Sequence, residues 1–178
     1  GLVSLGVAGG VDPSLRPGDI IVGTEVLAPD GRRFSTDRQW HEYMASAIGK
    51  VAPVREGRIV GSDTVVAAAG KWKLFEDTGA ACVDMESQAV AAAASAAGLP
   101  FAVLRAVADP ASVDIPEWIS RSVRADGGID LAKALGAAVI RPLDWRRLCR
   151  LAIGSRKARL NLGGAVGILG PGFGLFAR

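Results

Sequence analysis

Apolar residues follow two patterns along the chain, one typical of strands and one typical of helices. Period-two or continuous apolar runs predict strands at residues 2–5, 19–27, 54–60, 82–83 and 101–107. Apolar residues at helical spacing predict helices at residues 37–48, 71–77 and 87–97. Thr36 is the expected cap of the first helix, and Pro116, Asp130 and Pro142 mark the starts of three further helices.

The most clearly defined unit spans residues 82–108. A short strand leads into an Ala-rich helix that ends at Gly98, and the strand after it is apolar throughout except for Arg105. Such a run is typical of a strand buried on both faces of a parallel sheet. The unit is therefore β-α-β, and the fold class is α/β. We expect a single domain over residues 1–160, with a mixed, largely parallel central sheet flanked by helices. A Gly-rich C-terminal tail is expected over residues 161–178.

Composition narrows the classes of protein. Of the 178 residues 49% are hydrophobic, which is enough for one core, and no apolar run approaches the roughly 20 residues that span a bilayer. Two cysteines, Cys82 and Cys149, cannot form a disulfide framework, which favours a reducing, cytoplasmic location. The first residue is Gly1 rather than Met, so we expect the protein to start before it.

The formal net charge of +3 conceals an asymmetry along the chain. Residues 141–178 hold eight basic residues against one acid, Asp144, whereas residues 1–140 carry more acids than bases. The body of the protein is therefore not a basic nucleic-acid binder, and its cationic character lies in one C-terminal segment.

Two carboxylates are the main candidates for functional residues. Ligands of open α/β sheets bind beyond the carboxyl ends of the strands, and Glu86 and Asp109 are expected to leave adjacent buried strands at one such edge. Alone, Glu86 could be an acid at a helix N-terminus and Asp109 a turn residue before Pro110. Their convergence at one edge favours a functional site.

Three segments resemble a known family: GVAGGVDPSLRPGDIIV, GSDTVV and ACVDMESQAVAAAASAAGLPFAVLRAVADPAS. They look like the superfamily of nucleoside phosphorylases and methylthioadenosine/S-adenosylhomocysteine nucleosidases. The ADPAS-x-x-IPEW and PLDWRRLCRLA stretches are most similar to hopanoid-associated phosphorylases, which remove adenine from adenosylhopane. The resemblance covers about residues 2–160, and it implies that the family's first strand and helix would precede Gly1.

The resemblance implies an enzyme that cleaves the bond between purine and ribose in a 5′-substituted adenosine, as a step of hopanoid biosynthesis. Asp109 matches the family's general acid at nitrogen 7 of the purine, and Glu86 matches the residue that holds the ribose 2′-hydroxyl. The other implied substrate-binding residues are Met85, Val7, Ala8, Gly9, Val65 and Arg105. Arg105 would pair with a carboxylate at the sheet edge, with a purely structural role as the alternative.

The nucleophile stays open at this point. The Arg and Ser with which many phosphorylases of the superfamily bind phosphate are not matched near Ser4 and Val7, and Val65 stands where relatives often have an aromatic residue. No cofactor is expected, and phosphate is one candidate co-substrate. The alternatives are hydrolysis, as in the methylthioadenosine/S-adenosylhomocysteine nucleosidases, and a nucleoside-binding protein that has lost catalysis.

Other chemistries have weaker support. His41, the only histidine, is expected to have a surface or packing role, and one His with two distant Cys predicts no metal site. Neither cysteine has a nearby His that would activate it as a nucleophile. Asp63 matches a family loop near the base, with a turn-capping role as the alternative.

The C-terminal segment predicts a basic amphipathic helix. Trp145, Leu148, Cys149 and Ala152 form one apolar stripe, which arginines flank. Such a helix is typical of peripheral contact with the inner face of a membrane, although the stripe could equally pack on the sheet. The expected partners are a small-molecule nucleoside and further copies of this chain in a homo-oligomer, but no nucleic acid. If the substrate is adenosylhopane, the nucleoside carries a lipid.

Overall fold

A computed structural model describes residues 1–113 and 145–175. Its strands are β1 (Leu2–Gly10), β2 (Ile20–Leu27), β3 (Arg33–Ser35), β4 (Val54–Gly61), β5 (Cys82–Asp84) and β6 (Phe101–Asp109). Its helices are α1 (Arg38–Gly49), α2 (Ala68–Thr78), α3 (Ser87–Ala96) and α6 (Trp145–Leu169). The helices predicted to start at Pro116, Asp130 and Pro142 begin outside the described residues.

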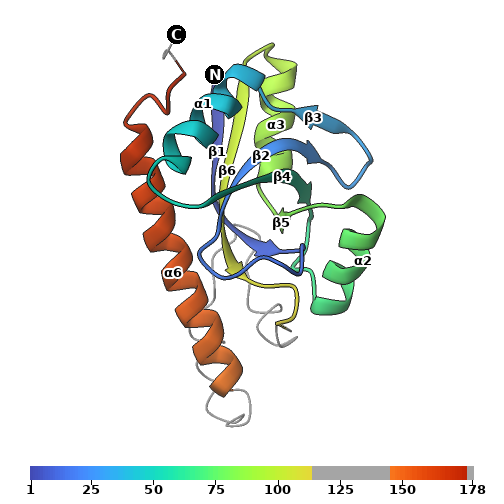
Figure 1. The fold of residues 1–178 in the computed structure, drawn as a ribbon. Coiled ribbons are helices and arrows are strands. Elements are labelled where there is room, and N and C mark those ends of the chain that lie inside the picture. Colours follow the sequence, from blue (N-terminus) through green and yellow to red (C-terminus); the bar gives the residue numbers. More distant parts are fainter. Residues whose placement is uncertain (114–144, 176–178) are drawn as a thin grey trace, which may run out of the picture.

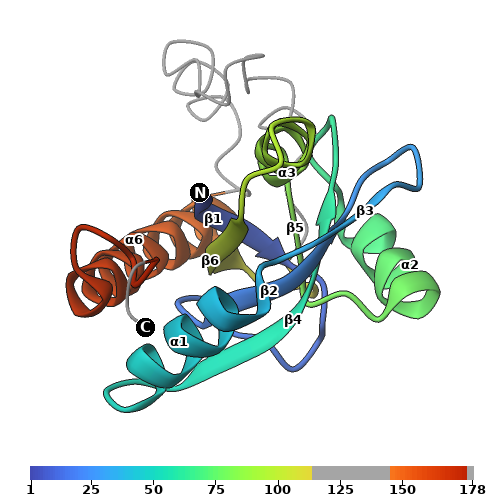
Figure 2. The same cartoon turned by 90° about the horizontal axis from the view of Figure 1, so that it is seen from above.

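The strands form one mixed sheet in the order β3-β2-β4-β5-β1-β6, and β6 also pairs with β2. The sheet therefore closes on itself like a barrel, with β3 as an extra strand beside β2. β1 runs parallel to β6 and antiparallel to β5. Helices surround the strands (Figures 1 and 2), which confirms the predicted α/β fold with a mixed sheet flanked by helices.

The long apolar run was the most informative sequence pattern. All nine residues of β6 are buried, including Arg105, as expected for a strand covered on both faces. β1 lies beside it in a continuous parallel register from Leu2 with Phe101 to Ala8 with Val107. The residues of the candidate site lie on these two strands and next to them.

Two local predictions are wrong. The N-cap of α1 is Asp37, whose carboxylate accepts a hydrogen bond from the Trp40 amide at 2.9 Å. The Thr36 hydroxyl instead donates to the carbonyls of Gly23 and Thr24 on β2. Strands β5 and β6 are not neighbours, because β1 pairs with both and lies between them.

The C-terminal segment is helical through most of its described length. The first residues of the expected Gly-rich tail, 161–169, are the last turns of α6. The helix packs along β6 and β1 through small residues, and Figure 1 shows it running along one side of the sheet. A Cβ at Gly154 would lie 2.2 Å from the Ala108 carbonyl oxygen, so only glycine permits this close approach. Tertiary packing thus stabilises the last turns of α6, although their glycines have a low helix propensity.

Candidate active site

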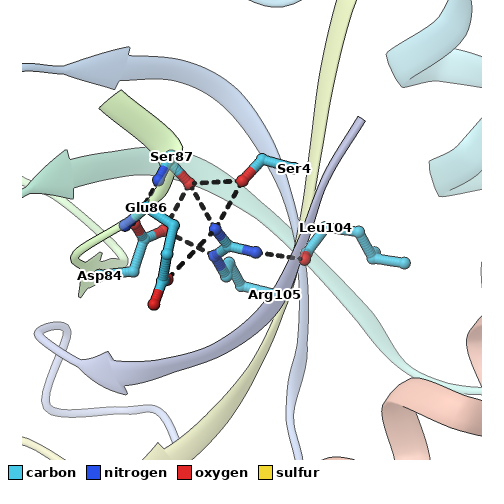
Figure 3. Close-up of polar contacts among 6 residues, drawn as sticks. All are labelled: Ser4, Asp84, Glu86, Ser87, Leu104 and Arg105. Carbon is cyan, nitrogen blue, oxygen red and sulfur yellow. Dashed lines mark hydrogen bonds and ion pairs between the residues drawn. The ribbon is translucent and has the colours of Figure 1, made fainter. Parts of the chain in front are cut away.

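A buried guanidinium lies at the centre of one polar cluster, which Figure 3 shows in close-up. Arg105 is fully buried on β6, and its Nε donates to Asp84 Oδ2 at 2.6 Å. Its Nη2 donates to the hydroxyls of Ser4 and Ser87 at 2.6 and 2.9 Å. A carboxylate and two hydroxyls thus compensate the desolvation of the cation. The prediction that Arg105 pairs with a carboxylate is confirmed, and that carboxylate is Asp84.

Asp84 also fixes the start of α3. Its Oδ1 accepts hydrogen bonds from the amides of Glu86 and Ser87 at 2.9 and 2.7 Å, and its Oδ2 accepts one from the Ser87 hydroxyl. The carboxylate therefore satisfies amides that the first turn of a helix leaves without partners. Asp84 holds the turn that carries Glu86.

The Glu86 side chain is exposed and, among the described residues, makes only one long ion pair. It occupies the N-cap position of α3 but makes no side-chain capping bond, since Asp84 provides that contact. The Glu86 side chain is 62% exposed, and its Oε2 lies 3.8 Å from Arg105 Nη2. Because Asp84 already neutralises the guanidinium, the Glu86 carboxylate remains available to a ligand from solvent.

Asp109 forms a second, separate pair. It ends β6 in register with Gly9 of β1, and its Oδ2 accepts a hydrogen bond from the ammonium group of Lys71 on α2. Both side chains are buried. Burial raises the pKa of the Asp109 carboxyl above its usual value, while the Lys71 ammonium acts in the opposite direction. A buried carboxyl with a raised pKa is suited to donating a proton.

The two carboxylates flank the same strand, although they do not come from adjacent strands. On one side of β1, Asp109 of β6 is in register with Gly9. On the other side, β5 pairs with Gly9 and Gly10, and Glu86 follows shortly after the end of β5. Gly6 lies beside Arg105, where an added Cβ would be 3.0 Å from Nη1. The glycines let backbone and side chains approach closely around the carboxyl end of β1.

The remaining predicted residues lie around this end of the sheet in different environments. Val7 is partly exposed on β1, and the Ala8 side chain is buried in the core. Met85 is half-buried in the turn before α3, and Val65 is half-buried in the loop between β4 and α2. In that loop, Asp63 accepts a hydrogen bond from Gln88 at 2.6 Å, which ties it to α3.

Sequence reasoning missed Lys71, Asp84, Ser4 and Ser87. Lys71 is 38 residues from Asp109, so no local pattern points to the pair. Asp84 did have a local signal in the sequence. An Asp just before a helix typically accepts hydrogen bonds from the backbone amides two and three residues after it.

Metal and thiol chemistry have no support in the described part of the chain. Among residues 1–113 and 145–175, no group of three or more His, Cys, Asp or Glu side chains could hold a metal ion. Cys82 is buried, and burial raises the pKa of its thiol, which disfavours the reactive thiolate. His41 is buried on α1, with Nε2 3.3 Å from a Glu56 carboxylate oxygen, consistent with a packing role.

Known proteins share this fold and part of the sequence. The nucleosidase for 5′-methylthioadenosine and S-adenosylhomocysteine from Campylobacter jejuni matches with a TM-score of 0.59 and 26% identity, over 65% of this chain and 58% of that one. The S-adenosylhomocysteine nucleosidase of Streptococcus pyogenes, solved with 5-methylthiotubericidin, matches with a TM-score of 0.57 and 25% identity, over 61% of this chain and 54% of that one.

A Helicobacter pylori 5′-methylthioadenosine/S-adenosylhomocysteine nucleosidase matches 93% of this chain and 67% of its own, with a TM-score of 0.59 and 18% identity, which supports the fold. The chain spans less than two thirds of the length of the first two structures. The family model described as the phosphorylase superfamily matches residues 1–139. With a matching family model over most of its length and the fold of these nucleosidases, the chain belongs to the phosphorylase superfamily.

Proposed function

We propose that this protein cleaves the N-glycosidic bond of a 5′-substituted adenosine and releases adenine. The observation that carries the proposal is the pair of unlike carboxyls flanking the end of β1. Asp109 is buried with a raised pKa, and Glu86 is exposed beside a guanidinium that is already neutralised. Two titratable groups in such different environments are suited to one acid role and one anionic role.

In the proposed reaction, the C1′–N9 bond breaks and its electron pair leaves with the purine. Asp109 donates a proton to nitrogen 7, so that adenine departs as a neutral molecule. The ribose carbon becomes cationic, and the Glu86 carboxylate holds the 2′-hydroxyl and stabilises that charge. Met85 provides an apolar wall for the ribose, and the backbone of Val7 to Gly9 lies close to the base. The oxygen of a phosphate then bonds to C1′, or a water oxygen does so and loses a proton to the Asp109 carboxylate or to solvent.

The similar nucleosidases support a 5′-substituted adenosine as the substrate class, because their names specify 5′-methylthioadenosine and S-adenosylhomocysteine. Within this class we propose a lipid-linked nucleoside of the adenosylhopane type. The support is the sequence resemblance to hopanoid-associated phosphorylases and the apolar and basic surface of α6, considered below. Hydrolysis of methylthioadenosine is the second candidate, favoured by the likeness to the nucleosidase structures.

The choice of nucleophile has a direct test. We propose phosphorolysis, although Arg105, next to Ser4, is engaged by Asp84 and is not free to bind phosphate in this arrangement. The purified protein should release adenine from adenosine with a 5′-alkyl substituent only when inorganic phosphate is present, with ribose 1-phosphate derivatives as the second product. Chromatography of reactions with and without phosphate measures both products. Equal adenine release without phosphate, with a free ribose derivative, would instead establish a hydrolase.

The outer surface of α6 supports contact with lipid. The helix packs on the sheet through the face of Gly154, Ala158, Ala165 and Leu169. Two residues of the predicted apolar stripe, Cys149 and Ala152, are exposed, and Leu148 is half-buried. Two large apolar side chains, Ile153 and Leu160, are also exposed, at 68% and 65%. Exposed arginines and one lysine, Lys157, lie along the same helix, as in a membrane-surface segment.

We therefore expect reversible binding to anionic membranes. Among the described residues no helix is long and apolar enough to cross a bilayer. The protein should co-sediment with phosphatidylcholine vesicles that contain phosphatidylglycerol, and binding should weaken as salt rises. The double variant Ile153→Ser/Leu160→Ser should bind less, because it removes apolar contact but keeps every charge. Equal recovery in the supernatant with and without anionic lipid would contradict lipid contact.

A further inference from the structure

Lys71 is a charged side chain in an unusual environment, because it is almost completely buried. It lies near the start of α2, yet only 1% of it is exposed, while its neighbours Trp72 and Lys73 are exposed. A lysine is almost never fully buried without a partner. Its partner is the carboxylate that the proposed reaction uses as its acid, Asp109.

Gly9 makes room for this contact. A Cβ at Gly9 would lie 3.1 Å from both Cε and Nζ of Lys71 and 3.5 Å from Asp109 Oδ2. The ammonium group therefore occupies the space beside β1 that any larger residue at position 9 would narrow. Nζ also lies 3.5 Å from the Asp109 carbonyl oxygen, so both the backbone and the side chain of Asp109 face it.

We propose that Lys71 is a positioning residue that sets the acid strength of Asp109 and orients its carboxyl for proton transfer. This inference rests on the proposed function and goes beyond it, because the family resemblance assigns the acid but not a cation beside it. In the described part of the chain, no other ion pair involves Lys71 or Asp109. β6 presents the carboxylate to Lys71, β1 presents only Gly9, and the charged residues after Lys71 on α2 are exposed. Arg16, Arg150 and Lys157 line the same cavity as Asp109 but form no ion pair with it.

The physical reason is a balance of two opposing effects on one proton. Burial alone would make Asp109 hold its proton strongly and release it poorly. A fixed ammonium stabilises the carboxylate that remains after the proton has moved to the purine. The Lys71 ammonium thus allows the buried Asp109 carboxyl to release its proton to the purine. The same contact holds the Asp109 carboxyl in one orientation at the end of β6.

The test compares Lys71→Met with Lys71→Arg. Methionine removes the charge but retains an unbranched apolar chain, so the pKa of Asp109 should rise by about 1–3 units. Arginine keeps the charge and should shift the pKa much less. Carbon-13 NMR titration of labelled aspartate carboxyls, with the signal assigned by its loss in Asp109→Asn, measures this without any substrate.

Kinetics give the second readout. The alkaline limb of the kcat profile should move to higher pH in Lys71→Met by the same amount, and maximal kcat should fall. A purely structural lysine would lower activity or stability without moving the limb. Should Lys71→Met not fold, Gly9→Ala provides a milder perturbation, since its methyl group presses on the ammonium and should shift the titration in the same direction.

An Asp109 titration that is unchanged or lower in the folded Lys71→Met or Gly9→Ala variant would overturn the inference. Failure of the proposed function looks different. In that case the wild-type protein would release no adenine, whereas the Asp109 titration would still depend on Lys71.

Discussion

Replacement of Asp109 by Asn should lower turnover by about two to four orders of magnitude, the usual contribution of a general acid. Asparagine has nearly the same shape and can still accept a hydrogen bond from Lys71, but it has no proton to donate to the leaving purine. We expect kcat to fall much more than KM changes, because proton donation matters mainly in the transition state. Adenine release measured by chromatography gives both constants.

A matched control separates the loss of the proton donor from the loss of one negative charge on the protein. Asp77→Asn makes the same substitution at an exposed position at the end of α2 and should leave turnover unchanged. Urea unfolding of both variants identifies any loss of activity that comes from loss of fold. Near-normal adenine release by a folded Asp109→Asn protein would remove Asp109 from the mechanism.

Replacement of Arg105 by Met should cost the fold about 3–5 kcal/mol, the usual effect of removing one partner of a buried ion pair. The Asp84 carboxylate would then be buried without a cation, and the hydroxyls of Ser4 and Ser87 would lose their shared donor. The turn before α3 should loosen as well, since the same carboxylate caps the helix. Urea denaturation measures the free energy of unfolding.

The exposed pair of Arg38 and Glu42 provides the comparison. Arg38→Met also removes an arginine from an ion pair, with an N–O distance of 2.8 Å, but its side chain is 89% exposed. That variant should unfold at nearly the wild-type urea concentration, because water screens surface pairs. If both arginine variants lost the same small amount of stability, the Arg105 cluster would not hold the fold together.

The sequence predicted those features that local pattern determines. The apolar run of residues 101–107 predicted a buried strand, and β6 is buried along its whole length. The positions of Glu86 and Asp109 at strand ends were likewise readable, because turn residues follow each apolar run. The pairing of Arg105 with a carboxylate was expected only from the family resemblance, and the structure shows the partner to be Asp84.

Long-range pairing accounts for what was not predicted. The insertion of β1 between β5 and β6 depends on hydrogen bonds between segments far apart in sequence, which no local period encodes. The contact of Lys71 with Asp109 has the same origin. The last turns of α6 were not predicted because Gly163, Gly164 and Gly167 disfavour a helix, whereas Ala165 and Leu169 pack on the core and outweigh that preference.

The central claim is that the two carboxyls flanking β1 act on one bound nucleoside as a catalyst. The most direct measurement incubates the purified protein with 5′-methylthioadenosine and phosphate, and counts both the adenine released and the nucleoside bound per chain. We expect many adenine molecules per chain, and a loss of that turnover in Asp109→Asn with binding retained. Nucleoside that binds in equal proportion to protein and is recovered intact would contradict catalysis and indicate a binding protein.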